Sequence, residues 1–276
     1  MTWTISSSEM PPLSLLFLGT GTSYGIPMLT CDCPVCTSSD PRDRRLRTAV
    51  LFQTPSTRLL LDTPPDLRTQ CLLHRIPSLD GVLLSHDHTD HLSGFDDLRP
   101  YSQHTPAPLP VFASPGTAAA VRAKFDHLFL PPVPGTTIGH IDLRPVPPDP
   151  TASISFRDLL LTPLPVSHGR ADMFGWKVTA GPVSAAVISD CKTIPPATLD
   201  ACRNLDLLVL DCLRLESHPT HMNLDEALAV VSLLRPRQTL LVHMCHHISH
   251  AALSALCPPT VSPAYDSLSI PLFPPS

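Results

Sequence analysis

The sequence has few charged residues and no long apolar segment. Only 16% of its 276 residues are charged, and 24 acidic residues outnumber 19 basic ones, which gives a net charge of −5. This balance argues against a protein that binds nucleic acid through bulk positive charge. No apolar run reaches the roughly 18 residues of a membrane-spanning helix. Residues 1–12 lack the basic and apolar regions of a secretory signal peptide.

Apolar residues, proline, histidine and cysteine are plentiful instead. The apolar fraction of 43% is enough for a sizeable core. The chain has 34 prolines, which are especially dense in a loop over 131–150 and a Pro/Ser-rich tail over 258–276. The 9 cysteines are odd in number and include a tight cluster. Without an export signal, this pattern predicts a reducing, cytoplasmic compartment, where clustered cysteines bind metal more often than they form disulfides.

Short apolar runs alternate with helical patterns along the chain. We expect strands over 13–18, 82–85, 109–113, 138–143, 154–163, 205–210 and 239–242, hairpins over 48–62 and 175–189, and helices over 66–75, 117–128 and 223–234. This alternation predicts an α/β layered fold. Because no linker divides the chain, we expect one domain over 1–276 with its core over about 13–250.

Several apolar runs end in a side chain that can bind a metal ion. His86, Asp190 and His243 each follow such a run. Since α/β sheets place their sites at the carboxyl ends of strands, these side chains would converge if the strands were neighbours.

The densest group of potential ligands lies between residues 86 and 91. His86 and His88 are two apart, so both rings face the same side of an extended chain, and Asp90 and His91 fall on the first turn of a helix. Four ligands in six residues crowd one ion, whereas two ions about 3.5–4 Å apart would use them all. The alternative is a polar loop of hydrogen-bonded histidines.

The pattern His86-x-His88-x-Asp90-His91, followed by Gly94, resembles the signature of the metallo-β-lactamase superfamily. That family's further ligands are a His, an Asp and a His, in this order. The resemblance implies an αββα sandwich that binds two divalent ions. It assigns metal 1 to His86, His88 and His168, metal 2 to Asp90, His91 and His243, and a bridging role to Asp190.

A second set of motifs resembles the PhnP-like cyclic phosphodiesterase branch of this superfamily. The set is Leu18-Gly19-Thr20-Gly21-Thr22-Ser23, then Gly25-x-Pro27, then Cys31-x-Cys33-x-x-Cys36. In that branch the three cysteines bind a structural zinc together with a histidine, which here is His246. Three thiolates and one imidazole are a standard closed zinc set. His247 and His250 compete with His246, and a reactive or merely buried cysteine trio is the alternative to zinc.

The donor types indicate the chemistry of the expected di-metal site. Imidazoles and carboxylates without thiolate suit zinc, manganese or iron. Water shared by two such ions is hydroxide at neutral pH and attacks phosphorus or carbonyl carbon. Asp90 and His221 are the catalytic candidates, since His221 matches the family position of a histidine that contacts phosphate or protonates the leaving oxygen. Asp62 and Asp211 are candidates for orienting ligand imidazoles, with turn-capping as the alternative.

We therefore expect a di-metal hydrolase that cleaves small cyclic phosphodiesters, such as a ribose cyclic phosphate or a 2′,3′-cyclic nucleotide. Its expected partner is that small substrate, and not a membrane or a large nucleic acid. The sequence leaves open whether the protein forms a homodimer. The alternatives are a transfer-RNA 3′-processing nuclease, a thioester hydrolase of the glyoxalase II kind, and a degenerate metal-binding protein. The low basic content and the cysteine cluster count against the nuclease.

Overall fold

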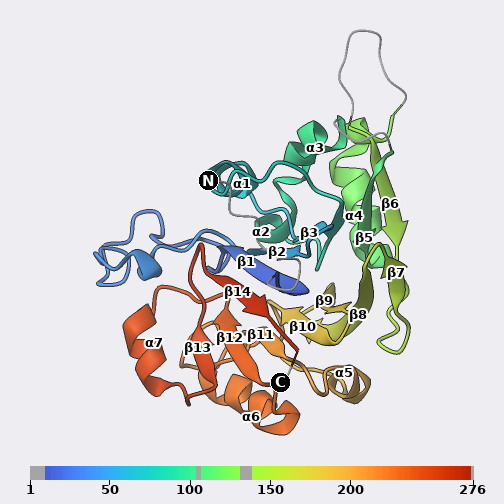
Figure 1. Cartoon of the computed structure of the whole chain (residues 1–276). Coiled ribbons are helices and arrows are strands. Elements are labelled where there is room, and N and C mark those ends of the chain that lie inside the picture. The colour runs from blue at the N-terminus through green and yellow to red at the C-terminus, as the bar shows by residue number, and fades with distance from the viewer. Residues whose placement is uncertain (1–9, 104–106, 131–138, 275–276) are drawn as a thin grey trace, which may run out of the picture.

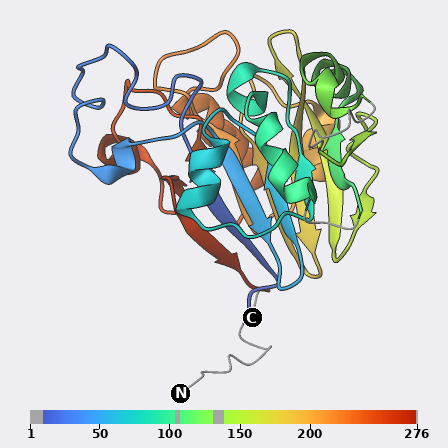
Figure 2. The same cartoon turned by 90° about the horizontal axis from the view of Figure 1, so that it is seen from above.

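The computed structural model describes residues 10–103, 107–130 and 139–274. Two seven-stranded sheets pack face to face, and helices cover the outer face of each sheet (Figures 1 and 2). The predicted αββα sandwich is therefore confirmed. Within the described residues, no helix combines the length and the apolar character needed to cross a membrane.

The first sheet combines the amino-terminal half of the chain with its last strand. The strand order is β14-β1-β2-β3-β4-β5-β6. The bounds in that order are Ser269–Leu272, Leu13–Gly19, Ala49–Gln53, Arg58–Leu61, Gly81–Leu83, Leu109–Ala113 and Ile141–Pro145. Strands β3 to β6 are parallel, so their carboxyl ends meet at one edge of the sheet.

The second sheet is built in the same way from the carboxyl-terminal half. Its order is β13-β12-β11-β10-β9-β8-β7. The bounds in that order are Val261–Pro263, Gln238–Val242, Leu207–Asp211, Val183–Ile188, Ala171–Ala180, Leu159–His168 and Ile154–Phe156. Strands β10 to β13 are parallel, and β8 runs in the same direction because β9 is antiparallel to both β8 and β10.

Helices α1 to α4 lie on the first sheet and α5 to α7 on the second (Figure 1). Their bounds are Leu67–Leu73, Thr89–Leu92, Arg99–Gln103, Pro115–Lys124, Pro196–Ala201, Leu224–Leu234 and His250–Leu256. Short 3-10 helices span Pro41–Asp43, Phe95–Leu98 and Asp126–Leu128. At the start of α6, the Asn223 side chain accepts from the Glu226 N–H, and the Glu226 carboxylate accepts from the Asn223 N–H, each at 3.0 Å. This capping box fixes the beginning of α6 just after His221.

The main core lies between the two sheets. Phe17 and Phe52 of the first sheet and Trp176 of the second are fully buried there. The Trp176 indole N–H donates to the backbone carbonyl of Leu84 at 3.0 Å, which satisfies a buried donor. Because Leu84 lies two residues before His86, this bond also fixes the end of β4 against the second sheet.

The structure extends the core beyond the expected end at about residue 250. Helix α7 and strands β13 and β14 all follow that point, with β13 paired to β12 and β14 paired to β1. The tail was misjudged because its strands are short and rich in proline and serine, although both join existing sheet edges. The helix expected over 117–128 is divided into α4 and a 3-10 turn. Residues 131–138 of the expected proline-rich loop lie outside the described residues.

The pairing of β14 with β1 predicts a stability difference between two neighbouring side chains. Leu272 is 6% exposed within the main core, and Phe273 is 48% exposed. Leu272→Ala should lower the free energy of unfolding by about 2–3 kcal/mol, because it leaves a cavity. The control Phe273→Ala should change it by less than about 1 kcal/mol. Urea denaturation measures both, and equal effects would show that β14 does not contribute to the core.

Candidate metal centre

The structure brings all seven predicted active-site ligands together where the strands end. His86 and His88 follow β4, Asp90 and His91 lie at α2, His168 ends β8, Asp190 follows β10 and His243 follows β12. They form two groups, and the ligand atoms within each group lie within 4.8 Å of one another. The groups are His86, His88 and His168, and Asp90, His91, Asp190 and His243.

Asp190 lies between the two groups. Its carboxylate oxygens are 3.3 Å from His91 Nε2 and 3.3 Å from His243 Nε2, both in the second group. One oxygen is also 3.9 Å from His168 Nε2 in the first group. This is the position that the bridging assignment requires.

Several ligand atoms are buried with no hydrogen-bond partner among the described residues. They include His86 Nε2, His91 Nε2 and Asp190 Oδ1. A buried polar atom without a partner costs about 1–3 kcal/mol, so three of them converging on one place indicate a group that binds there. Imidazole nitrogens and carboxylate oxygens are suitable ligands for divalent metal ions, and the residues therefore fit such ions.

Asp62 orients two of the candidate ligands. Its carboxylate accepts from His91 Nδ1 at 2.7 Å, from the Ser85 N–H at 2.7 Å and from the Ser85 hydroxyl at 2.8 Å. The Ser85 hydroxyl donates its one hydrogen bond to Asp62. Its oxygen therefore accepts a hydrogen bond from His86 Nδ1, at 2.9 Å. Both rings thereby keep Nε2 as a lone-pair donor. The role expected for Asp62 matches this geometry, whereas Ser85 was missed because only its place before His86 distinguishes it.

Asp211 orients His221 and not one of the predicted metal ligands. Its carboxylate lies 2.9 Å from His221 Nδ1 and accepts from the Cys191 N–H at 2.8 Å. The His221 ring stacks on His243, with centroids 4.8 Å apart and planes 12° apart. His221 is therefore fixed beside the candidate ligands with Nε2 as its remaining nitrogen.

Charges within the site balance one another. Burial favours neutral Asp90, but His91 and His243 outweigh it and hold the Asp90 pKa well below its usual range. Burial also disfavours a charged His91, yet Asp190, Asp90 and Asp62 raise its pKa, so a bound metal ion would take the place of the second proton on Nε2. Burial, with a smaller effect of His243, lowers the pKa of His221 to about 4. The Asp90 carboxylate is therefore ionised at neutral pH and able to act as a ligand.

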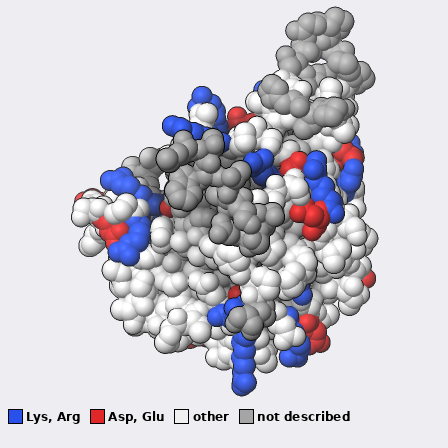
Figure 3. Space-filling model, viewed as in Figure 1, with Lys and Arg blue, Asp and Glu red and all other residues white. Residues whose placement is uncertain are grey.

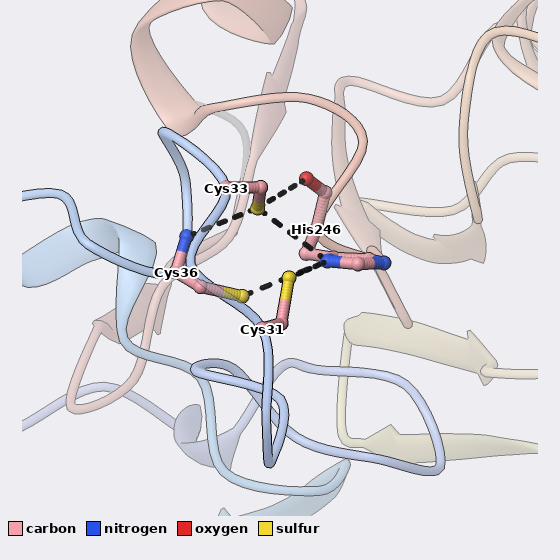
Figure 4. Close-up of side chains that lie close together, drawn as sticks. All are labelled: Cys31, Cys33, Cys36 and His246. Carbon is pink, nitrogen blue, oxygen red and sulfur yellow. Dashed lines mark hydrogen bonds between the residues drawn. The ribbon is translucent and has the colours of Figure 1, made fainter.

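A second candidate metal site lies on the loop between β1 and β2. Figure 4 shows the sulfurs of Cys31, Cys33 and Cys36 around Nδ1 of His246. Their distances to Nδ1 are 3.2, 3.5 and 3.6 Å. A tetrahedral zinc with Zn–S of about 2.3 Å and Zn–N of about 2.0–2.1 Å places sulfur about 3.5 Å from nitrogen. The geometry therefore fits zinc, and the three cysteines gather around His246 in preference to His247 or His250.

A buried ion pair also holds this cysteine loop in place. Arg45 and Asp43 are both buried and lie 3.2 Å apart. Arg45 donates to the Cys245 carbonyl at 3.2 Å, and Asp43 accepts from the His250 N–H at 2.7 Å. The loop is thus attached to the segment after β12 on both sides of His246.

The fold and the two groups of candidate ligands identify the family of this chain. A model of the beta-lactamase superfamily domain matches residues 57–244, and this chain belongs to that superfamily. The matched region contains every candidate ligand from His86 to His243 and ends before His246. Within the superfamily, the chain falls in the PhnP-like branch. It is 34% identical to a solved diphosphatase of the PhnP family, covering 94% of this chain and 97% of that one, with a TM-score of 0.85.

Other relatives differ more in length or in sequence. An octanoyltransferase from Porphyromonas gingivalis is 34% identical over 92% of this chain and 50% of its own length. The chain thus spans half or less of the length of these curated relatives. Zinc-bound PqqB from Methylobacterium extorquens is 19% identical, with a TM-score of 0.76 over 94% of this chain and 100% of that chain. The short form of human tRNase Z is 17% identical, with a TM-score of 0.69 over 93% of this chain and 98% of that chain.

The contacts of Asp62 predict a loss of metal binding when its charge is removed. Asp62→Asn should weaken binding at the di-metal site by about 10-fold to 100-fold, because His91 loses its charged acceptor and Ser85, the acceptor of His86, loses the carboxylate that orients it. The matched control is Asp158→Asn, whose carboxylate accepts from the hydroxyls of Thr54, Ser56 and Thr57 instead. Competitive titration with a metal indicator measures the affinity. An unchanged affinity in Asp62→Asn would contradict the orienting role.

The cysteine cluster predicts one zinc that is separate from the active-site ions. Cys36→Ser should lower the zinc content by about one equivalent per chain, because a closed zinc site needs four ligands. The control Cys257→Ser removes a half-buried thiol outside the cluster and should leave the content unchanged. Elemental analysis after gel filtration measures both variants. Equal zinc content would rule out the assignment.

Proposed function

We propose that this protein is a di-metal phosphodiesterase for small phosphodiesters, with ribose cyclic phosphates and 2′,3′-cyclic nucleotides as expected substrates. The placement of Asp190 between two groups of imidazoles, with His221 beside them, is the observation that carries the proposal. The likeness to a diphosphatase of the PhnP family, at 34% identity, supports chemistry at phosphorus.

The candidate ligands would hold two divalent ions, zinc or manganese or iron, and the cysteine cluster one zinc. When bound, the two active-site ions supply a nucleophile from water at neutral pH and offset negative charge on the phosphoryl oxygens. Asp62 keeps the Nε2 atoms of His86 and His91 directed at those ions.

In this proposal, His221 acts on the substrate directly. Asp211 holds its Nδ1, so Nε2 is the atom that faces the substrate. A bound phosphate would favour protonation of Nε2 through its negative charge, and the protonated ring could then donate to a phosphate oxygen or pass its proton to the leaving oxygen. Its ring lies 4.6 Å from that of His168 and 4.8 Å from that of His243, centroid to centroid. A substrate phosphate between the two ligand groups would therefore lie next to this imidazole.

Two alternative activities are less well supported. A transfer-RNA nuclease needs a basic surface for the RNA backbone. In the face shown in Figure 3, lysine and arginine side chains are scattered, several beside acidic ones, and form no continuous basic stripe. A thioester hydrolase finds some support in the octanoyltransferase relative, but this chain spans only half of that protein.

A substrate panel separates the three activities. The protein, supplied with Zn²⁺ or Mn²⁺, would be assayed with 2′,3′-cyclic AMP, bis-p-nitrophenyl phosphate, an octanoyl thioester and a precursor transfer RNA. We expect turnover of the two small phosphodiesters and none of the other two. Preferred cleavage of the thioester or of the RNA would overturn the proposal.

The position of Asp190 predicts the effect of its removal. Asp190→Ala should reduce hydrolysis of 2′,3′-cyclic AMP by more than about 100-fold, because the carboxylate shared by the two ligand groups is lost. The zinc of the cysteine cluster should remain, since Asp190 is not part of that group. The control Asp200→Ala removes an exposed carboxylate and should keep full activity. Steady-state rates and zinc content check the prediction, and retained turnover would exclude the bridging role.

A further inference from the structure

The segment that carries Asp190 also holds His221 in two places. Asp190, Cys191 and Lys192 follow β10 in the chain. The Cys191 N–H donates to the Asp211 carboxylate at 2.8 Å, and the same oxygen lies 2.9 Å from His221 Nδ1. The Lys192 ammonium donates to the backbone carbonyl of His221 at 3.4 Å. The ring and the backbone of His221 are therefore both attached to the segment that supplies the candidate bridging ligand.

The backbone of Lys192 is fixed against the end of β8. Its N–H donates to the Ser167 carbonyl at 2.7 Å, and the Ser167 N–H donates to the Thr193 carbonyl at 3.0 Å. Ser167 directly precedes the candidate ligand His168 in the sequence. The Lys192 side chain thus starts from a part of the backbone that lies two residues after Asp190 and is paired with the strand end that carries His168.

A second contact fixes the Lys192 side chain at its other end. The ammonium donates to Glu226 Oε1 at 2.5 Å, and the other oxygen of Glu226 accepts from the Asn223 N–H in the capping box of α6. The Lys192 side chain is 24% exposed and that of Glu226 38%, so water covers this pair only in part. An ammonium has three N–H donors and no acceptor, so both contacts of Lys192 can form together.

The loop that carries His221 contacts the site at three consecutive residues. The Thr220 carbonyl accepts from His168 Nδ1 at 2.9 Å, and the Met222 N–H donates at 3.4 Å to the carboxylate that holds the His221 ring. The contact from Lys192 lies between these two and acts on His221 itself. Because the ring moves with its own backbone, a shift at this carbonyl would move Nε2 relative to the candidate ligands.

We propose that Lys192 is a positioning residue that holds His221 in place as the acid for the leaving oxygen. This inference rests on the proposed phosphodiesterase function and specifies the part that His221 takes in it. In the reaction, the oxygen of a water molecule bonds to phosphorus and the water releases a proton. The bond from phosphorus to the ribose oxygen breaks with its electron pair on that oxygen, which takes the proton of His221 Nε2. The proton released by the water balances the one that His221 gives.

Two substrates with different leaving groups test this inference. 2′,3′-Cyclic AMP releases a ribose oxygen, which is strongly basic and needs a proton, whereas bis-p-nitrophenyl phosphate releases p-nitrophenolate, which leaves without one. Lys192→Met removes the ammonium and should lower kcat for 2′,3′-cyclic AMP about 10-fold to 100-fold, with KM nearly unchanged, because a catalytic group displaced by about 1 Å loses rate on this scale. For bis-p-nitrophenyl phosphate, kcat should change less than about 2-fold.

The second substrate also shows whether the variant is intact. Activity on bis-p-nitrophenyl phosphate requires a folded, metal-loaded protein, so its retention excludes unfolding as the cause of the loss. An equal loss of kcat for both substrates would overturn the inference while leaving phosphodiesterase activity established.

Two further lysine variants control this experiment. Lys192→Arg keeps a charged donor and should recover part of the lost kcat, which a loss of packing alone would not predict. Lys177→Met is the matched control, because Lys177 on β9 also donates to a backbone carbonyl, that of Ala201 in α5, at 2.9 Å. It should leave kcat for both substrates unchanged.

A double-mutant cycle shows whether Lys192 acts through His221. In a His221→Ala background, Lys192→Met should cause no further loss of kcat for 2′,3′-cyclic AMP, because the group that it positions is gone. Independent losses that multiply in the double variant would overturn the inference.

A spectroscopic readout does not need turnover. The His221 Nδ1 proton is bonded to the buried Asp211 carboxylate, so it should give a downfield proton resonance in the zinc-loaded protein. Its exchange with water should be about 10-fold or more faster in Lys192→Met than in the wild type, because His221 loses one of the contacts that hold it. If no phosphodiester is hydrolysed but this difference is found, the proposed function fails and the positioning by Lys192 stands. Equal exchange rates would show that Lys192 does not hold His221.

Discussion

The buried Asp190 carboxylate constrains how the two halves of this molecule pack. It is buried, and an ionised carboxylate is costly to remove from water unless opposite charges or hydrogen-bond donors surround it. His91 from the first half of the chain and His243 from the second each lie 3.3 Å from it. The two sheets must therefore pack in one register to neutralise this charge. Fold and site are thus two results of the same packing.

The sequence was most informative where ligands are close together along the chain. The spacing from His86 to His91 indicates two groups of ligands, because extended backbone and a helical turn place alternate side chains on defined sides. The strand ends before Asp190 and His243 were visible as apolar runs. The assignment of distant residues to one site, and of His246 to the cysteines, came from family resemblance, since nothing in residue spacing measures distance between separate strands.

Other features depend on tertiary contacts that leave little trace in sequence. Ser85 connects Asp62 to His86 through a hydroxyl, and any small polar residue looks the same before a histidine. Asp211 ends an apolar run as Asp62 does, yet it holds His221. Strands β13 and β14 are too short and too rich in proline and serine to show a period of two. A pocket beside His221 lies between the loop after β1, the loop between β11 and α6, and the segment after β12. Only the fold brings these three segments together.

The cysteine cluster lies next to the pocket beside His221, and one side of the pocket, called its wall below, belongs to the loop that carries the cysteines. Residues 22–25 and Met28 line the pocket, and Cys31 follows them closely on the same loop. Because His246 belongs to both the cluster and the pocket lining, the position of this wall depends on the cluster. The buried Arg45–Asp43 pair holds the same loop from its other side. A zinc ion remote from the reaction would in this way determine the shape of the space that admits the substrate.

The pairing of β14 with β1 has a practical consequence for handling this protein. Leu13 lies opposite Leu272, so the first and last strands begin and finish side by side. The other end of β1 leads to Gly21, which bridges to Met244 next to His243. A fluorophore attached at the exposed Phe273, next to Leu272, would hence sit at the pole opposite the catalytic edge, where it leaves the entrance unobstructed.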